Sequence, residues 1–117
     1  MTKAEALRKE YEARVNKAIN GSDNVEFVCA DAGAFLKTAG DYETIVMDPP
    51  RAGMQKGVME RIDRMAAKTI VYMSCNPKTF RDDVAVLENY RIESVEAFDM
   101  FPQTPHVELL GVLKPRP

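Results

Sequence analysis

Residues 69–77, TIVYMSCNP, are the most informative stretch about the fold class, because an apolar run is followed there directly by residues typical of a helix start. The run is rich in β-branched and aromatic residues, which is typical of a buried strand. Asn76 is a preferred N-cap residue, and Pro77 is favoured at the first position of a helix. We therefore predict a strand followed directly by a helix, with Cys75 at the junction.

Cys75 is expected beside the N-terminus of that helix, where aligned peptide dipoles leave a partial positive charge. This charge favours the thiolate, which is the form of cysteine that attacks carbon. A lone cysteine at a strand end is otherwise most often a small buried apolar side chain. We interpret Cys75 as a candidate nucleophile and Cys29, which lies within another expected strand, as a core residue.

Helical and strand-like patterns alternate along the rest of the chain. A capping box at residues 2–5 predicts a first helix, and Gly21 is a suitable residue to end it. No helical segment separates the last two strands. The expected helices are 4–19, 32–38, 58–66 and 77–89, and the expected strands are 25–29, 44–47, 69–73, 90–98 and 107–113.

This order of elements predicts an α/β fold with a Rossmann-like sheet. Strands separated by helices form βαβ units, so we expect the sheet to be mostly parallel, with a C-terminal antiparallel strand pair at one side. In open α/β sheets, ligands bind beyond the carboxyl ends of the strands. Asp31, Asp48 and Cys75 each lie just beyond an expected strand and are therefore expected at one rim.

The composition is that of an ordinary soluble globular protein, with 45% hydrophobic and 29% charged residues. A length of 117 residues is enough for one domain, which we place at residues 1–117. The net charge of −2 gives no reason by itself to expect RNA binding. No apolar run approaches the roughly 20 residues of a membrane span. The 2 cysteines lack CxxC spacing, which favours a reducing cytoplasm over a disulfide framework or a metal site.

Three segments together resemble the RNA uracil-5-methyltransferase family, whose members use S-adenosylmethionine and modify 23S rRNA or tRNA. They are DPPRAG at residues 48–53, YMSCNP at residues 72–77 and DMFPQTPHVE at residues 99–108. The first segment alone is common among methyltransferases, whereas the second and third in this order are specific. The resemblance runs from about residue 21 to residue 113 and implies the C-terminal part of the catalytic domain.

The resemblance also implies a mechanism and its residues. In this family a cysteine thiolate adds to carbon-6 of uracil, so that carbon-5 becomes able to accept a methyl group. A base then removes the proton from carbon-5. The matching positions are Cys75 as the nucleophile and Glu108 as the base. Glu108 also begins an apolar strand, where a carboxylate is costly unless it lies at the rim or is paired.

The binding residues follow from the same resemblance. Asp48 matches a position that contacts the target base or the cofactor, and Asp31 matches the acidic position near the cofactor's adenine. Asp31 is equally well explained as the N-cap of a short helix. Arg51 is expected to bind the substrate, by contact with phosphates. For His106 we expect a structural role or a contact with the substrate base, since the cysteine–glutamate scheme leaves it no proton to move.

The family's glycine-rich turn is not found in this chain, because Gly33 and Gly40 do not form a GxGxxG pattern. The first two strands of the family's sheet are also not found. We therefore expect weak S-adenosylmethionine binding and no activity from this chain alone, whether it is a fragment or a natural short protein. Unpaired sheet edges invite new partners. We expect either that strand 25–29 moves over to pair with strand 44–47, or that two chains form a homodimer.

Two other functions stay open at this point. A methyltransferase acting on another base or on a small molecule would share the fold. The RNA cytosine-5 enzymes carry a Pro-Cys pair after the aspartate and a Thr-Cys-Ser segment, and this chain has neither. A non-enzymatic assembly module would explain the missing glycine-rich strand, although intact Cys75 and Glu108 argue against it. We expect RNA as the partner of the complete protein and no membrane association.

Overall fold

The computed structural model describes residues 2–21, 23–28, 30–99, 103 and 105–117. The chain divides into two compact units, Met1–Phe35 and Leu36–Pro117. The prediction of a single domain over residues 1–117 stays a prediction.

In the first unit, helix α1 (Lys3–Ile19) begins and ends where the sequence indicates. The Thr2 hydroxyl accepts a hydrogen bond from the backbone N–H of Glu5 at 3.1 Å, which satisfies one of the free donors of the first turn. Gly21 has a φ of 66°, and its N–H donates to the carbonyl oxygen of Ala18 at 3.3 Å. This left-handed residue closes the helix as expected.

The predicted strand over residues 25–29 is wrong for residues 25–28, which form neither strand nor helix, while Cys29 lies outside the described residues. The proposed pairing of this segment with residues 44–47 is therefore also wrong. A strand needs a neighbour for its backbone N–H and C=O groups. Here the side chain of Arg14 donates to the carbonyl oxygen of Phe27 at 3.4 Å instead.

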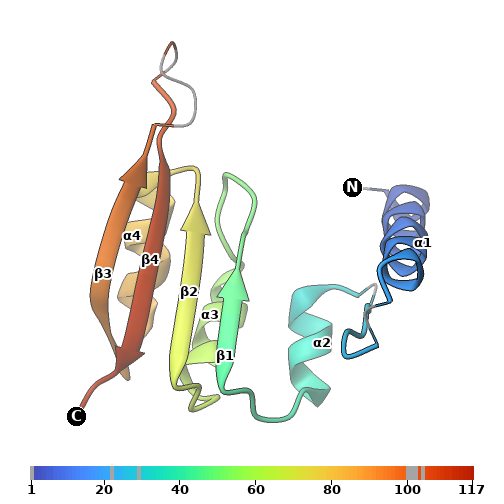
Figure 1. Cartoon of the computed structure of the whole chain (residues 1–117). Coiled ribbons are helices and arrows are strands. Elements are labelled where there is room, and N and C mark those ends of the chain that lie inside the picture. The colour runs from blue at the N-terminus through green and yellow to red at the C-terminus, as the bar shows by residue number, and fades with distance from the viewer. Residues whose placement is uncertain (1, 22, 29, 100–102, 104) are drawn as a thin grey trace. The chain divides into compact units, whose positions relative to one another are not determined.

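The described part of the second unit contains one sheet with the strand order β1-β2-β4-β3 (Figure 1). Strand β1 pairs with β2 in parallel, while β4 is antiparallel to both β2 and β3. The α/β fold and the C-terminal antiparallel pair are confirmed. Parallel pairing is confined to β1 and β2, because residues 25–28 add no strand. The elements are β1 (Thr44–Met47), β2 (Thr69–Ser74), β3 (Tyr90–Phe98), β4 (Glu108–Pro115), α2 (Ala32–Thr38), α3 (Lys56–Asp63) and α4 (Pro77–Val86).

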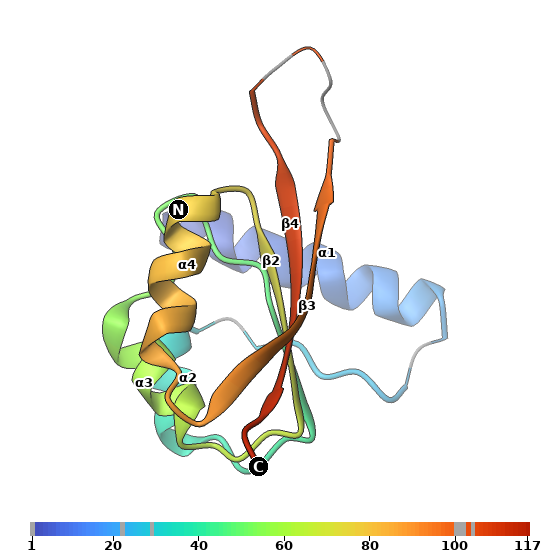
Figure 2. The same cartoon turned by 90° about the vertical axis from the view of Figure 1, so that its left-hand side faces the viewer.

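Helices α3 and α4 cover the same face of this sheet (Figure 2). The largest of the fully buried side chains are Tyr72, Met59, Ile62, Ile70 and Leu113, which come from α3, β2 and β4. The Phe80 ring of α4 meets the Tyr72 ring edge-on, with the ring centroids 5.2 Å apart. Gly111 of β4 lies beneath this pair, and a Cβ atom there would be 2.6 Å from Phe80 Cζ. The core is therefore closed by a tight contact that only glycine permits.

Candidate active site

Three of the predicted site residues lie at one end of the sheet. Asp48 follows β1, Cys75 follows β2, and Glu108 begins β4. Because β1 and β2 are parallel while β4 is antiparallel to β2, these positions share one rim, at the top of the sheet in Figure 1. The prediction that Asp48 and Cys75 share a rim is confirmed by this topology.

Cys75 directly follows β2, and Glu108 is the first residue of the neighbouring strand β4. The register of β2 and β4 ends with Ser74 opposite Leu109, so Cys75 and Glu108 are the two residues next to the last pair, at the same end of the sheet. Both side chains are half-buried, and the Cys75 thiol is free. Neither group is therefore sealed in the core. A thiol and a carboxylate at one rim of a sheet can serve as a nucleophile and a base for one bound ring.

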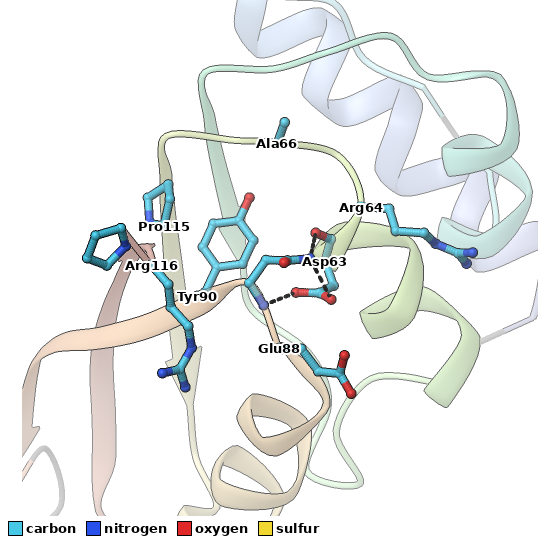
Figure 3. A pocket seen from close by; sticks show the side chains of 9 residues that line it. Asp63, Arg64, Ala66, Glu88, Tyr90, Pro115 and Arg116 are labelled. Carbon is cyan, nitrogen blue, oxygen red and sulfur yellow. Dashed lines mark hydrogen bonds between the residues drawn. The ribbon is translucent and has the colours of Figure 1, made fainter.

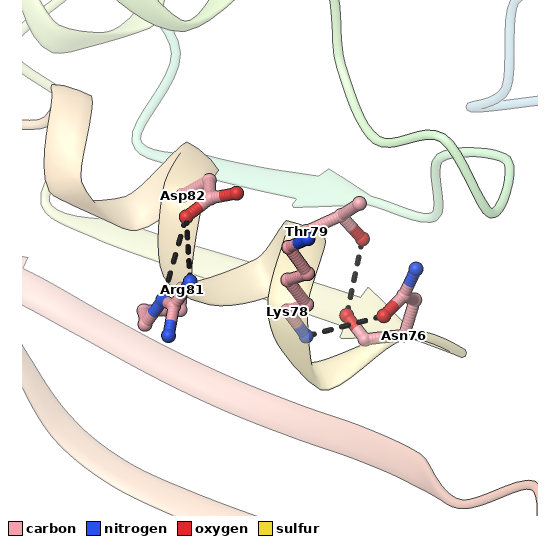
Figure 4. A network of polar contacts seen from close by, with 5 residues as sticks. All are labelled: Asn76, Lys78, Thr79, Arg81 and Asp82. Carbon is pink, nitrogen blue, oxygen red and sulfur yellow. Dashed lines mark hydrogen bonds and ion pairs between the residues drawn. The ribbon is translucent and has the colours of Figure 1, made fainter.

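A polar turn holds Cys75 at the start of α4. The buried Ser74 Oγ accepts from the backbone N–H of Asn76 at 3.0 Å and donates to the carbonyl oxygen of Asn76 at 2.9 Å. The Asn76 side chain in turn accepts from the backbone N–H of Lys78 at 3.1 Å and caps α4 (Figure 4). The predicted junction of strand and helix is confirmed. Cys75 is therefore fixed between a strand end and a capped helix N-terminus.

The segment after β1 packs against the first turns of α4. The backbone N–H of Gly53 donates to the carbonyl oxygen of Pro50 at 2.8 Å, which closes a tight turn. The carbonyl oxygen of Arg51 accepts from Asn76 Nδ2 and from Thr79 Oγ1, each at 3.3 Å. Two α4 side chains thus hold the backbone of a predicted substrate-binding residue.

The side chains of Arg51 and His106 are in contact, although the two residues are 55 positions apart in the sequence. Arg51 Nη1 lies 3.3 Å from His106 Nδ1, and both residues are exposed. The sequence indicated each residue as a substrate contact but did not indicate that they touch. This contact joins the segment after β1 to the residues that precede β4.

Asp31 belongs to the first unit and is described there. Its Oδ2 accepts from the backbone N–H of Ala34 at 3.2 Å, at the start of α2. The N-cap explanation of Asp31 is therefore confirmed. Its cofactor role stays a prediction.

Asp83 is a residue that the sequence analysis missed. Its Oδ2 accepts from the backbone N–H of Met54 at 2.9 Å and from the hydroxyl of Tyr72. Burial, and then the hydrogen bond to Asp83, raise the pKa of Tyr72 well above its usual range. The signal available in the sequence was the spacing of Asn76, Thr79 and Asp83, which places three polar side chains on one face of α4.

A surface hollow of about 720 Å³ lies at the other end of the sheet, where β3 begins and β4 ends (Figure 3). Some of its polar groups form hydrogen bonds within the protein. Asp63 accepts from the backbone N–H of Asn89 at 2.9 Å, and the Tyr90 hydroxyl donates to the carbonyl oxygen of Ala67 at 2.8 Å. None of the predicted site residues lines this hollow, so it is separate from the Cys75 rim.

The sheet order, the helices on its face and the reactive rim are those of a Rossmann-like methyltransferase domain. Residues 11–116 match the family described as tRNA (Uracil-5-)-methyltransferase, and the chain therefore belongs to this family. The chain is 43% identical over 102 residues to a tRNA (uracil(54)-C(5))-methyltransferase of Pyrococcus furiosus. It is 47% identical over 94 residues to a 23S rRNA (uracil(747)-C(5))-methyltransferase of Xenorhabdus bovienii.

Solved structures agree with this assignment. The Pyrococcus abyssi tRNA (uracil-54, C5)-methyltransferase, solved in complex with S-adenosyl-L-homocysteine, superimposes with a TM-score of 0.80 at 43% identity over 89% of this chain. TrmN from Thermus thermophilus gives a TM-score of 0.63 at 14% identity over 89% of this chain, which shows the fold alone.

The match covers a limited part of each relative. It spans 87% of this chain but 24% of the Pyrococcus furiosus protein, 80% of this chain but 25% of the Xenorhabdus bovienii protein, and 26% of the Pyrococcus abyssi structure. The matched region is the C-terminal part of these relatives. Within the part of the chain that the structure describes, no helix combines the length and apolar character needed to cross a membrane.

Proposed function

We propose that this chain supplies the nucleophile and the base of an S-adenosylmethionine-dependent RNA (uracil-5-)-methyltransferase. The observation that supports the proposal is the pairing of β2 and β4, in which Cys75 follows the end of β2 and Glu108 begins β4 at the same rim. Membership of the family gives this pair its chemistry. The activity belongs to a complete domain, because the relatives are about four times as long as the matched region.

The Cys75 thiolate adds to carbon-6 of the uracil ring and forms a carbon–sulfur bond. The electron pair of the 5,6 double bond moves onto carbon-5 and the adjoining carbonyl, so carbon-5 becomes enolate-like and nucleophilic. S-adenosylmethionine, when bound, supplies a methyl group as an electrophile. The position of Cys75 before the capped N-terminus of α4 supports this role, since the helix end stabilises a nearby negative charge.

Glu108 completes the reaction as a general base. It takes the proton from carbon-5 of the adduct, the 5,6 double bond re-forms, and the carbon–sulfur bond to Cys75 breaks. The thiolate is thereby regenerated. Glu108 is half-buried at the start of β4, where it is accessible to a ring held above the rim.

Arg51 and His106 are proposed to bind the substrate. A guanidinium group has only donors, so the contact with Arg51 makes His106 Nδ1 an acceptor. We propose that the His106 imidazole contacts a carbonyl oxygen of the base. Asp48, exposed at the end of β1, is proposed to contact the base or the cofactor.

The described residues fit only part of an S-adenosylmethionine site. Asp48 lies at the rim, and Asp31 has one carboxylate oxygen bonded to the N–H of Ala34. The glycine-rich turn that cradles the methionine part is not in this sequence. Cofactor binding by this chain alone is therefore expected to be weak. Since the relatives include both tRNA and 23S rRNA enzymes, the proposed substrate is a uridine-containing RNA.

The test is covalent capture on RNA that contains 5-fluorouridine, whose carbon-5 carries no removable proton. One arm uses the chain alone, for which we expect no adduct and weak S-adenosylhomocysteine binding by calorimetry. The other arm uses a hybrid in which this chain replaces the matching part of the Pyrococcus abyssi enzyme. We expect the hybrid, given RNA and S-adenosylmethionine, to form an adduct that mass spectrometry locates on Cys75.

Matched variants of the hybrid assign the roles. Cys75→Ser should abolish the adduct, whereas Cys29→Ser should retain it. Glu108→Gln should accumulate a methylated adduct with ordinary uridine, because the proton on carbon-5 stays in place and the sulfur is not expelled. A hybrid that binds S-adenosylhomocysteine but forms no adduct, or an adduct that survives Cys75→Ser, overturns the proposal.

A further inference from the structure

The carboxylate of Asp83 joins three elements beneath the Cys75 rim. It projects from α4, accepts from the backbone N–H of Met54 at 2.9 Å and accepts from the hydroxyl of Tyr72 on β2. Tyr72 has 0% exposure, so its hydroxyl needs a partner inside the protein. Because burial and Asp83 both raise the pKa of Tyr72, this hydroxyl stays a donor throughout the physiological range of pH.

The backbone at Gly53 is fitted to Asp83. Gly53 has a φ of 85°, a conformation that residues with a Cβ atom rarely adopt. A Cβ atom there would lie 2.8 Å from Asp83 Oδ2 and 3.3 Å from Thr79 Cβ. The segment after β1 therefore lies directly on α4, with the carboxylate filling the space that a larger residue would need.

The same segment is held again two residues earlier. Asn76 Nδ2 and Thr79 Oγ1 both donate to the carbonyl oxygen of Arg51 at 3.3 Å. Asn76, Thr79 and Asp83 follow i, i+3, i+7 spacing and so line one face of the α4 start. Residues 51–54 are thus fastened to α4 at both ends, and the Arg51 side chain extends from the first of these two residues toward His106.

We propose that Asp83 is a positioning residue, which holds residues 51–54 on α4 and so sets the place of the Arg51 guanidinium beside His106. The proposal rests on the proposed function only in giving Arg51 a role toward the substrate. Asp83 itself touches the backbone of Met54 and the Tyr72 hydroxyl, and it acts on the site through them.

The test is amide hydrogen exchange of the whole chain, followed residue by residue by NMR. In Asp83→Ala, the Met54 amide loses its acceptor, and we expect its exchange to become at least about tenfold faster. The ladder amides of β2 and β4 should rise by a smaller factor, about fivefold, because loss of the hydrogen bond between Tyr72 and Asp83 lowers the unfolding free energy by about 1 kcal/mol. Asp82→Ala is the matched control, because this substitution removes the same charge from the preceding position. The Asp82 carboxylate pairs with Arg81, with Oδ1 and Nη2 3.3 Å apart, and not with Met54 or Tyr72.

A conservative variant keeps the proposal testable if Asp83→Ala does not fold. Asp83→Asn retains an acceptor oxygen without the charge, which makes the hydrogen bond weaker but leaves it in place. We expect Met54 exchange in this variant to be about threefold faster than in the wild type, which lies between the wild type and Asp83→Ala. Asp82→Asn should leave Met54 exchange unchanged.

A second readout follows the site itself. Imidazole nitrogen shifts of His106 should change in Asp83→Ala and remain unchanged in Asp82→Ala. Exchange that rises equally in Met54 and in the β2–β4 ladder would mean general destabilisation and overturn the proposal, as would unchanged Met54 exchange in both Asp83 variants. Neither measurement uses RNA or a methyl donor, so its failure is distinguishable from failure of the proposed function.

Discussion

The guanidinium of Arg51 lies 3.3 Å from Nδ1 of His106, across 55 positions of the sequence. Because a guanidinium cannot accept a hydrogen bond, a hydrogen bond in this pair needs Nδ1 as its acceptor, so the contact favours the tautomer that carries its proton on Nε2. The tautomer of His106 thus depends on the position of the Arg51 side chain.

Removal of the Arg51 side chain should allow His106 to adopt both neutral tautomers. In Arg51→Ala, we expect the imidazole nitrogen shifts of His106 at pH 8 to move toward a mixture of the two neutral tautomers. Arg91→Ala, which alters an exposed arginine of β3, is the control and should leave the shifts unchanged. Identical His106 spectra in Arg51→Ala and the wild type would show that Arg51 does not select the tautomer.

Gly111→Ala should destabilise the protein, because the new Cβ atom would lie 2.6 Å from Phe80 Cζ in the core. Overpacking of this kind costs about 1–3 kcal/mol of unfolding free energy, measurable by urea denaturation. Gly57→Ala is the matched control, since nothing lies within 4 Å of a Cβ atom there. In helix α3 that change should raise stability by about 0.5–1 kcal/mol. Equal effects at the two glycines would contradict the packing described here.

The raised pKa of Tyr72 predicts a loss of stability in alkaline solution. A tyrosine whose folded-state pKa is raised contributes stability that is fully present below about pH 10, the pKa of an unfolded tyrosine. That contribution is lost as the pH rises further toward the folded-state pKa. Burial raises the pKa of Tyr90 as well, so the wild type should lose stability through both groups.

Tyr72→Phe isolates the contribution of Tyr72. It should lower the unfolding free energy at pH 8 by about 1 kcal/mol, because the hydrogen bond to Asp83 is lost. It should also flatten the decline between about pH 10 and pH 11, as measured by urea unfolding. Tyr42→Phe, at a side chain that is 44% exposed, is the control. Parallel stability curves for Tyr72→Phe and the wild type would contradict the prediction.

The outer edge of β1 predicts self-association. Among the described residues, β1 pairs with β2 on one side and with no strand on the other. Unpaired backbone groups of an edge strand can bind the edge of a second chain. We therefore expect a dimer that increases with concentration in analytical ultracentrifugation.

Val46→Lys should weaken this dimer, because Val46 is 64% exposed on β1 and a lysine disfavours edge-to-edge pairing. Val25→Lys, outside the sheet, is the control. A wild type that stays monomeric at all concentrations would exclude the homodimer.

Local signals allowed most element positions to be predicted. The Thr2 cap, Gly21 at the helix end and Asn76 before Pro77 all act within a few residues, and each lies where the sequence indicates. Residues 25–28 have the composition of a strand but form none. A strand depends on a partner, and the partner is not encoded in the segment itself.

The site was predictable as a set of residue types but not as a set of contacts. Cys75 and Glu108 follow from motif order, and their place at one rim depends on the pairing of two strands far apart in sequence. The spacing of Asp83 from Asn76 and Thr79 was a weak signal, because an acidic residue beside Asp82 within a helix usually faces solvent. Its role depends on Met54 and Tyr72, which fold around it.

Helix α4 bears both the capped turn after Cys75 and the contacts to the Arg51 backbone. A small tilt of this helix against the sheet would carry the thiol-bearing turn and the arginine together. The distance between Cys75 and Arg51 would therefore change little when the helix moves. The distance of both residues from Glu108, which belongs to β4, would change instead.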